Sequence, residues 1–342
     1  MKQPILSAVM LVYNGESHLK EAIDSVLKQN FKDFELIIVN DGSNDGSLDV
    51  INQYSDGRIR VINNVTNMGI PYSRNLGLKN AKGEFLAWCD CDDINFPARF
   101  EDQINFLKAN SEFGVCGTWQ LSFTGKRYAV HKTKNDPELV KAGLLFLPTI
   151  MNPTSMLRLS MIRGNNLFYN TELAIAEDHD FFLRCSMFFP LTNVQKVLVK
   201  YRASETSIIK KFKSKETESE EIRNIIHRQA INYLGIEPNE YELRYHSWIC
   251  SNKKFASFAE FESCYNWLIT LKRKNMEAKT FDKKALNKVL ANRFYIISKK
   301  ASLYGFVTFK YYLRKSHKSF RYMNFKHAVK LAFLCFYKNN IL

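Results

Sequence analysis

The chain has 342 residues, of which 46% are hydrophobic and 13% aromatic, so it can bury the core of one large domain or two ordinary ones. Its seven cysteines show no disulfide-framework spacing, which argues against a small disulfide-rich secreted protein and favours a reducing cytoplasm. The sequence contains no signal-peptide pattern and no run of about 18 apolar residues, so we expect no membrane-spanning helix.

The formal charge of +15 lies almost entirely in the second part of the chain. Residues 1–199 contain 20 Lys and Arg and 22 Asp and Glu, whereas residues 200–342 contain 29 and 12. The last 60 residues, from Lys283, contain 14 basic residues and no acidic residue. This asymmetry predicts that the C-terminal part meets an anionic partner.

Apolar segments of strand length alternate with helical segments at the start of the chain: residues 5–12, 34–39, 58–63 and 84–89. Between the first two, residues 21–30 carry apolar side chains at helical spacing. Between the last two, Pro71 and Gly83 mark the start and the end of another helix. The alternation predicts an α/β, Rossmann-like fold in which helices flank both faces of a mostly parallel sheet.

The loops after these strands hold polar side chains, and ligands of parallel sheets bind beyond the carboxyl ends of the strands. Tyr13 offers an aromatic face to a base, or it is an ordinary loop tyrosine. Asp41 can accept hydrogen bonds from a ribose or a base, or it can form a simple Asx turn. Arg74 can meet a phosphate or a base carbonyl, or it can form a surface salt bridge.

Asp90-Cys91-Asp92-Asp93, at the end of the fourth predicted strand, is the sharpest feature. Three carboxylates within four residues repel one another, and a buried cluster of this kind needs a cation. Oxygen ligands suit Mg²⁺ or Mn²⁺, which also bind substrate phosphates. The alternative is a solvated acidic turn, but the position after an apolar strand favours a metal site.

Three later segments are expected to be mixed loop and strand, a helix, and a strand: residues 144–163, 178–189 and 194–201. The helix begins with Glu177-Asp178-His179-Asp180, where the helix dipole stabilises negative charge. One of these carboxylates could act as a general base. The alternative is that Asp178 only caps the helix.

The C-terminal part, from Ser214 onward, has a mostly helical pattern. We place a domain break near residue 205, which divides the chain into an α/β domain over residues 1–205 and a basic helical region over residues 206–342. In the last 60 residues Lys and Arg alternate with Phe and Tyr. This pattern fits an anionic membrane surface, a nucleic-acid site, or a helical cap with a basic face.

Four segments carry a combined resemblance to one family: residues 9–47, 67–93, 152–158 and 176–185. Their order and spacing resemble those of the family 2 inverting glycosyltransferases, which have the GT-A fold, and the resemblance covers residues 4–205. It implies transfer of a sugar from a nucleotide diphosphate donor, with UDP as the expected carrier, to a hydroxyl acceptor. The anomeric centre would be inverted in a single displacement.

The resemblance also implies roles for particular residues. Tyr13, Asp41, Arg74 and Asp90 would bind the donor nucleotide. Asp92 and Asp90 match the DxD motif and would bind Mn²⁺ or Mg²⁺.

On the acceptor side, the resemblance makes Asp178 the catalytic base and places Asn152 beside the acceptor. Family members often act on lipid-linked or surface-polysaccharide glycans at the inner face of the plasma membrane. This favours peripheral binding of residues 283–342 to an anionic membrane, and we expect no nucleic-acid partner.

Two departures from the family pattern matter. Ser204 stands where the family often has a histidine that reaches the metal, which puts a third protein ligand in doubt. The Q-x-x-R-W motif of processive synthases is absent, so we expect one sugar to be added per event.

Two other functions fit the sequence less well than transfer. A sugar-nucleotide nucleotidyltransferase would need a Gly-rich phosphate loop after the first strand, where this chain has VYNGESH. A non-catalytic binding protein on a transferase scaffold would not need Asp90, Asp92 and Asp178, all of which are present.

Overall fold

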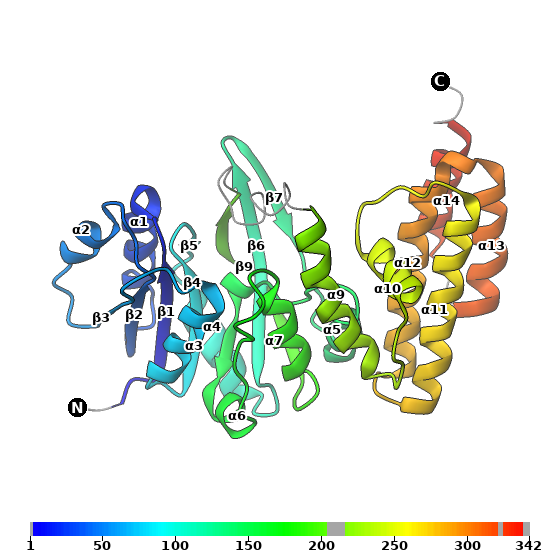
Figure 1. Ribbon diagram of the computed structural model, residues 1–342. Helices are drawn as coiled ribbons and strands as arrows, with labels where there is room; N and C mark the ends of the chain where they lie inside the picture. Colours follow the sequence, from blue (N-terminus) through cyan, green and yellow to red (C-terminus); the bar gives the residue numbers. More distant parts are fainter. Residues whose placement is uncertain (1–2, 204–215, 321–323, 338–342) are drawn as a thin grey trace. The chain divides into compact units, whose positions relative to one another are not determined.

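The computed structural model describes residues 3–203, 216–320 and 324–337 (Figure 1). The chain divides into a sheet unit, Met1–Val140 with Pro148–Ser219, and a helical unit, Lys141–Leu147 with Glu220–Leu342. The domain break predicted near residue 205 lies outside the described residues, as does Ser204. Within the described ranges, no helix combines the length and the apolar character needed to cross a bilayer.

In the described part of the sheet unit, nine strands form one sheet in the order β3-β2-β1-β4-β8-β6-β9-β5, with β7 paired to β6. Strands β1, β2, β3 and β4 run parallel to one another, whereas β8 is antiparallel to both β4 and β6. The strands are β1 Leu6–Val12, β2 Phe34–Asn40, β3 Ile59–Asn63, β4 Phe85–Asp90, β5 Ile94–Asn95, β6 Val115–Thr124, β7 Arg127–His131, β8 Met156–Arg158 and β9 Leu191–Arg202.

The helices of the first half of the chain are α1 Glu16–Leu27, α2 Ser47–Asn52, α3 Ile70–Asn80, α4 Arg99–Ala109, α5 Pro137–Gly143, the 3₁₀ helix η1 Asn152–Thr154, α6 Leu159–Gly164 and α7 Glu177–Cys185. The second half contains α9 Glu216–Asn232, α10 Glu240–Cys250, α11 Phe258–Ala278, α12 Lys283–Lys300, the 3₁₀ helix η2 Ala301–Tyr304, α13 Phe306–Phe320 and α14 Phe325–Tyr337.

Strand β1 lies at the centre of the parallel part of the sheet, between β2 and β4 (Figure 1). It is apolar except for Ser7 because both of its faces are covered. Val12 pairs with Asn40 of β2, and Leu11 pairs with Asp90 of β4. The loops after these three strands therefore leave the same edge of the sheet, where the strand order reverses and ligands bind.

Helices on both faces fix this edge. On one face, apolar side chains of α1 and α4 share a core cluster with alternate residues of β1. On the other face, α3 packs directly on the sheet at Gly77, where a Cβ atom would lie 2.5 Å from Val9 Cγ1. The strands predicted over residues 5–12, 34–39, 58–63 and 84–89 are thus confirmed as β1 to β4.

Two later predictions need correction. The helix predicted over residues 178–189 is α7, which ends at Cys185, because the following amides of Met187 and Phe188 bond to carbonyls three residues back and form turns. The strand predicted over residues 194–201 is β9, which is longer because it pairs with β6 from Leu191 to Arg202.

The helical unit has an aromatic core of its own. Phe294 of α12 lies at its centre, with ring centroids 4.9 Å from Tyr265, 5.4 Å from Tyr312 and 6.1 Å from Phe261. Side-chain caps begin three of its described helices: Asn239 forms a capping box with Glu242 at α10, Ser257 accepts from a backbone amide at α11, and Asp282 accepts from two at α12.

Candidate active site

The turn after β4 holds the aspartates of the DxD motif. Asp90 ends the strand with its side chain 30% exposed, whereas Asp93 is only 1% exposed. Asp93 Oδ1 accepts a hydrogen bond from the backbone N–H of Arg202, and Arg202 Nε donates to the carbonyl of Asp92. Asp93 is therefore directed toward β9, and Asp90 and Asp92 are the carboxylates left to bind a ligand.

The negative charge of this turn is only partly compensated by the protein, through Arg74, Arg202 and Arg99. Burial and the neighbouring Asp90 raise the pKa of Asp92 to about 6. Burial, Asp90 and Asp92 raise the pKa of Asp93 well above its usual range, and its Oδ2 atom is buried with no hydrogen-bond partner. A divalent cation would relieve this repulsion, so the donor set fits an oxygen-bound metal such as Mg²⁺ or Mn²⁺.

The second acidic group lies at the start of α7. The helix follows Ala176, which has a left-handed backbone with φ of 56° and no capping side chain. Asp178 is thus the second helical residue and not the cap, and its Oδ1 accepts from the N–H of His179 at 2.8 Å. Asp180 forms an ion pair with Arg184 at 2.6 Å, so the charge of Asp180 is balanced within the helix.

Low-dielectric surroundings dominate the electrostatics of the α7 start. Burial raises the pKa of Glu177 to about 7, and the charge of Asp178 adds to this rise. Burial also raises the pKa of Asp178, although Arg74 and His179 oppose the shift. Both pKa values are thus shifted upward from the usual carboxyl range, as is common for carboxyls that act as general bases.

Arg74 of α3 joins the two acidic groups. The residue is 5% exposed, and its Nε donates to Glu177 Oε1 at 3.3 Å. An Nη atom of the same guanidinium lies 4.0 Å from Asp90 Oδ1. The planar group also lies 5.1 Å from the Trp88 ring and 5.6 Å from the Tyr169 ring. This is a buried ion-pair network, in place of the surface salt bridge that was the alternative interpretation.

Tyr201 of β9 lies close to both acidic groups. Burial is the largest cause of its raised pKa, followed by the charges of Asp90, Asp93, Asp92 and Asp178. The phenol therefore lies within the field of the DxD motif and of the α7 start together.

Asp41 is buried at the end of β2 and organises the loop before α3. Its Oδ1 accepts from Asn64 Nδ2 at 2.7 Å and from the Met68 N–H at 2.9 Å, and its Oδ2 accepts from the Gly69 N–H at 2.9 Å. The bonds of Asp41 are not those of a simple Asx turn, because they reach residues 64, 68 and 69; the preceding Asn40 accepts locally, from the Ser43 N–H. Asp41 therefore connects the β2 and β3 loops at the sheet edge.

Tyr13 and Asn152 have opposite exposures. Tyr13 is 47% exposed in the loop after β1, and the same loop contacts the DxD turn at Gly15, where a Cβ would lie 3.0 Å from Cys91 Sγ. Asn152 is 3% exposed in η1, and its Oδ1 accepts from the Tyr169 hydroxyl at 3.1 Å. The acceptor-side role of Asn152 stays a prediction, with Tyr169 as its immediate neighbour.

Comparison with known proteins decides the family. Residues 7–181, half of the chain, match the family described as Glycosyl transferase family 2. An uncharacterized glycosyltransferase of Haemophilus influenzae is 30% identical over 248 residues, which cover 68% of this chain and 76% of that protein. The chain belongs to glycosyl transferase family 2.

Solved structures agree with the fold of this family 2 glycosyltransferase. S. aureus TarS 1–349 in complex with UDP-GlcNAc has a TM-score of 0.60 at 18% identity, covering 96% of this chain and 90% of that one. The GT-A fold predicted from the sequence is thereby confirmed. Among curated relatives, the Escherichia coli UDP-Glc:alpha-D-GlcNAc-diphosphoundecaprenol beta-1,3-glucosyltransferase WfgD is 29% identical over 212 residues, covering 61% of this chain and 81% of that protein.

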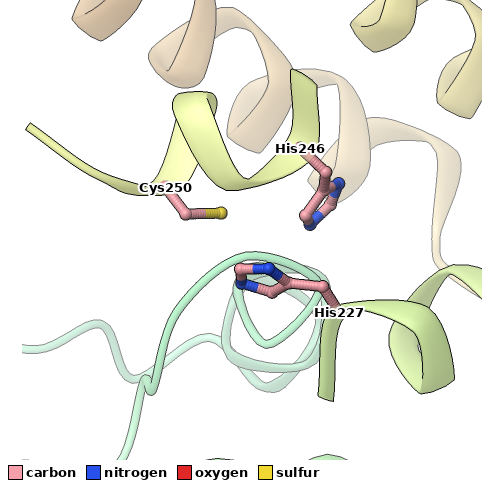
Figure 2. A group of neighbouring side chains, drawn as sticks. All are labelled: His227, His246 and Cys250. Atoms are coloured by element: carbon pink, nitrogen blue, oxygen red, sulfur yellow. The ribbon is translucent and has the colours of Figure 1, made fainter. Parts of the chain in front are cut away.

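A second group of possible metal ligands lies in the helical unit of this glycosyltransferase. Side-chain ligand atoms of His227, His246 and Cys250 lie within 4.8 Å of one another (Figure 2). However, His246 Nδ1 accepts from the indole N–H of Trp267 at 3.2 Å, and an indole can only donate. Nε2 of the neutral ring then carries the proton and bonds to the Leu145 carbonyl at 2.9 Å. His246 offers no lone pair to a metal.

Several residues of the family 2 site were missed by sequence reasoning: Glu177 as a partner of Arg74, Tyr169, Tyr201 and the buried Arg99. Arg99 is fully buried and donates to the carbonyls of Trp88 and Ser155, which holds β4 and η1 behind the DxD turn. The available signal was an arginine six residues after Asp93, too common a pattern to single out.

Proposed function

We propose that this glycosyltransferase transfers one sugar from a UDP-sugar to a hydroxyl of a lipid-linked or surface-polysaccharide glycan, with inversion and with help from Mn²⁺ or Mg²⁺. The observation that carries the proposal is the Arg74 bridge, with Asp90 of the DxD turn on one side and Glu177, next to Asp178, on the other. A metal-bound pyrophosphate and a proton acceptor for the incoming alcohol need this proximity.

Donor binding is assigned to the sheet edge. The exposed ring of Tyr13 can stack on the base, and Asp41 sets the shape of the loop that would surround the ribose. Arg74 supports the donor site through Asp90 and adds positive charge near the diphosphate. The choice of UDP is supported by the TarS complex with UDP-GlcNAc and by the donor in the name of WfgD.

The metal would be held by Asp92 and Asp90, because Asp93 is engaged by the backbone of Arg202. When bound, the ion supplies positive charge to the diphosphate oxygens as the leaving group departs. Mn²⁺ is supported by a structure with a TM-score of 0.51, at 12% identity, titled mannosyltransferase PcManGT from Pyrobaculum calidifontis in complex with GDP-Man and Mn²⁺.

In the proposed reaction the acceptor oxygen forms a bond to the anomeric carbon while the bond from that carbon to the diphosphate oxygen breaks. Asp178 takes the proton of the acceptor hydroxyl, and UDP leaves with the bonding electrons. Arg74 contacts both Glu177 and Asp90, which keeps the base next to the DxD turn. Attack from the face opposite the leaving group inverts the centre.

The proposed acceptor and location are supported by the name of a relative. WfgD is named for an acceptor linked to undecaprenol through a diphosphate, so a lipid-linked glycan is the acceptor class we propose. Such an acceptor lies at a membrane, and we propose that the enzyme works at the cytoplasmic, inner face of the plasma membrane, with residues 283–342 toward anionic lipid.

The decisive test is Asp178→Asn. We expect transfer to fall by roughly 10³-fold, because the variant lacks the proton acceptor. Thermal stabilisation by UDP-sugars with Mn²⁺, measured over a panel of sugars, should remain. Glu172→Gln, at an exposed acid shortly before α7, is the matched control and should keep full transfer. Full transfer by Asp178→Asn would refute the base assignment, and a wild-type chain that binds donors but neither transfers nor hydrolyses them would be a binding protein.

A further inference from the structure

Helix α14 has two apolar faces. Its inner face is formed by Ala328, Leu331 and Cys335, which are 7%, 0% and 2% exposed. On the outside, Phe325 is 76% exposed and Val329 is 53% exposed. A helix that only caps a bundle needs one apolar stripe and is polar elsewhere, so the second stripe of α14 is unexplained by folding.

The outer face of α14, defined as Phe325, Val329, Phe333 and Phe336, forms a continuous apolar surface. Phe325, Val329 and Phe333 line a shallow groove of about 580 Å³ together with Lys326 and Lys330. At the other end of the helix, the Phe336 ring lies 5.7 Å from that of Phe306, which begins α13 and is 58% exposed. The surface therefore extends from α14 onto α13.

This face is held firmly on the helical unit. Helix α14 packs against α12 and α13 (Figure 1). His327, on the turn between the two apolar faces, stacks on Tyr295 of α12 with ring centroids 3.8 Å apart and planes 3° apart. The outer face is thus presented by a packed helix, and its exposure does not arise from a loose end of the bundle.

The charge around the outer face selects among partners. Lys326 and Lys330 flank the groove, Lys310, Arg314 and Lys318 are exposed on α13, and the sequence has no acid after Asp282. A second copy docked about a two-fold axis would bring the same lysines together, which is repulsive. Nucleic acid would satisfy the charge but leave the aliphatic Val329 without a partner. An anionic lipid surface satisfies the lysines at its headgroups and the apolar side chains just below them.

We infer that the outer face of α14 inserts into the headgroup–acyl boundary of an anionic bilayer, with Lys326 and Lys330 at the phosphate level. Phe325 and Val329 are the apolar anchors, and the exposed bases of α13 approach the same lipid surface. The inference names the contact surface for the membrane location proposed above and rests on that proposal for its choice of partner. Binding itself requires no turnover, so it can be tested apart from catalysis.

The test is sedimentation of the full chain with vesicles of phosphatidylglycerol and phosphatidylcholine, compared with phosphatidylcholine alone. We expect binding only to the anionic vesicles. The double variant Phe325→Ser/Val329→Ser should weaken that binding at least about tenfold, because two apolar side chains no longer enter the lipid. The control, Ile225→Ser/Met276→Ser, removes two apolar side chains with exposures of 53% and 54% elsewhere in the helical unit and should bind normally.

Other results would overturn the inference. These are absence of binding to anionic vesicles, equal binding by the Phe325→Ser/Val329→Ser variant, or a dimer or RNA complex that this variant disrupts while vesicle binding is unchanged. Circular dichroism and UDP-sugar hydrolysis verify that the double variant is folded. Asp178→Asn should bind vesicles like the wild type, so failure of the proposed catalysis and failure of the docking surface give different results.

Discussion

The sheet unit and the helical unit use charge in opposite ways. In the sheet unit, basic and acidic residues nearly balance, yet three aspartates crowd one turn, where burial and Asp90 raise the pKa of Asp92 to about 6. In the helical unit, the last 60 residues carry 14 bases and no acid, and those bases spread over helix surfaces. Concentrated charge that the protein only partly compensates indicates a site for a small ion, whereas dispersed charge beside apolar side chains indicates an extended partner.

The two units also differ in how they treat buried polar groups. Around the sheet edge, Arg74 and Glu177 keep charges buried in a network that spans 103 residues of sequence. In the helical unit, His246 is fixed as a neutral ring between an indole and a carbonyl. The sheet unit keeps the charge of Arg74 buried beside carboxyls, whereas the helical unit keeps His246 neutral. This difference indicates that the chemistry takes place in the sheet unit.

The largest effect is expected for Asp92→Asn. We predict that metal-dependent transfer falls by about 10³-fold or more, since the ion loses a carboxylate and the leaving group loses its counter-charge. Asp102→Asn is the control, because it removes an acid of the same unit that pairs with Lys196 at the surface. Transfer rates at saturating Mn²⁺ measure both. Full activity in the Asp92 variant would mean that the crowded turn is not the metal site.

The same Asp92 variant gives a test of stability with a defined sign. Because the folded-state pKa of Asp92 is raised to about 6, the folded state holds this proton more tightly than the unfolded state does. The contribution of Asp92 to stability is then fully present below its unfolded-state pKa of about 4 and is lost as the pH rises through 6. Metal-free Asp92→Asn should therefore be more stable than the wild type at pH 7.5, by about 1–2 kcal/mol by urea denaturation. A variant less stable than the wild type would contradict the interpretation that the charge of Asp92 destabilises the metal-free fold.

Arg74→Met should cost about 2 kcal/mol of stability at pH 8.5, where the Glu177 carboxyl, whose pKa is about 7, is ionised in the wild type and would lose its cation. Adding Glu177→Gln should recover part of this loss, since the unpaired charge is then removed. Transfer should stay low in both variants, because the DxD turn and the base are no longer joined. Denaturant midpoints and initial rates separate the two effects, and additive losses of stability would show that the pair is not coupled.

The pH dependence of transfer should reflect the raised pKa values at the start of α7. Burial raises the pKa of Asp178 and that of Glu177, the latter to about 7. A base must be unprotonated, so transfer should rise with pH and fall by up to about tenfold per pH unit below the raised pKa. Initial rates from pH 5.5 to 8.5 at saturating donor and metal test this. A flat profile would indicate that neither carboxyl takes the proton.

Part of the fold and of the site could be predicted from the sequence, and part could not. Apolar runs predicted β1 to β4 and the shared edge, because a parallel sheet covered on both faces leaves that pattern in the chain. The joining of Arg74 to Glu177 and the turning of Asp93 toward Arg202 could not be read from it, since both are contacts between segments about 100 residues apart. Local sequence patterns predict helices, strands and loops. Contacts between distant segments determine which carboxylates are left to bind a ligand.

The smallest effect is expected for Lys330→Gln, which tests whether lipid binding by the helical unit is independent of catalysis by the sheet unit. Lys330→Gln removes one positive charge beside the α14 groove, and we expect about fivefold weaker binding to anionic vesicles, since one base near such a surface contributes about 1 kcal/mol. Hydrolysis of UDP-sugars in solution should not change, because that reaction needs only the acidic sheet edge. The difference from wild type should shrink in 0.5 M salt, where the Debye length falls to a few ångströms. Equal vesicle binding at low salt, or a parallel loss of hydrolysis, would show that charge in the helical unit does not act as an independent contact with lipid.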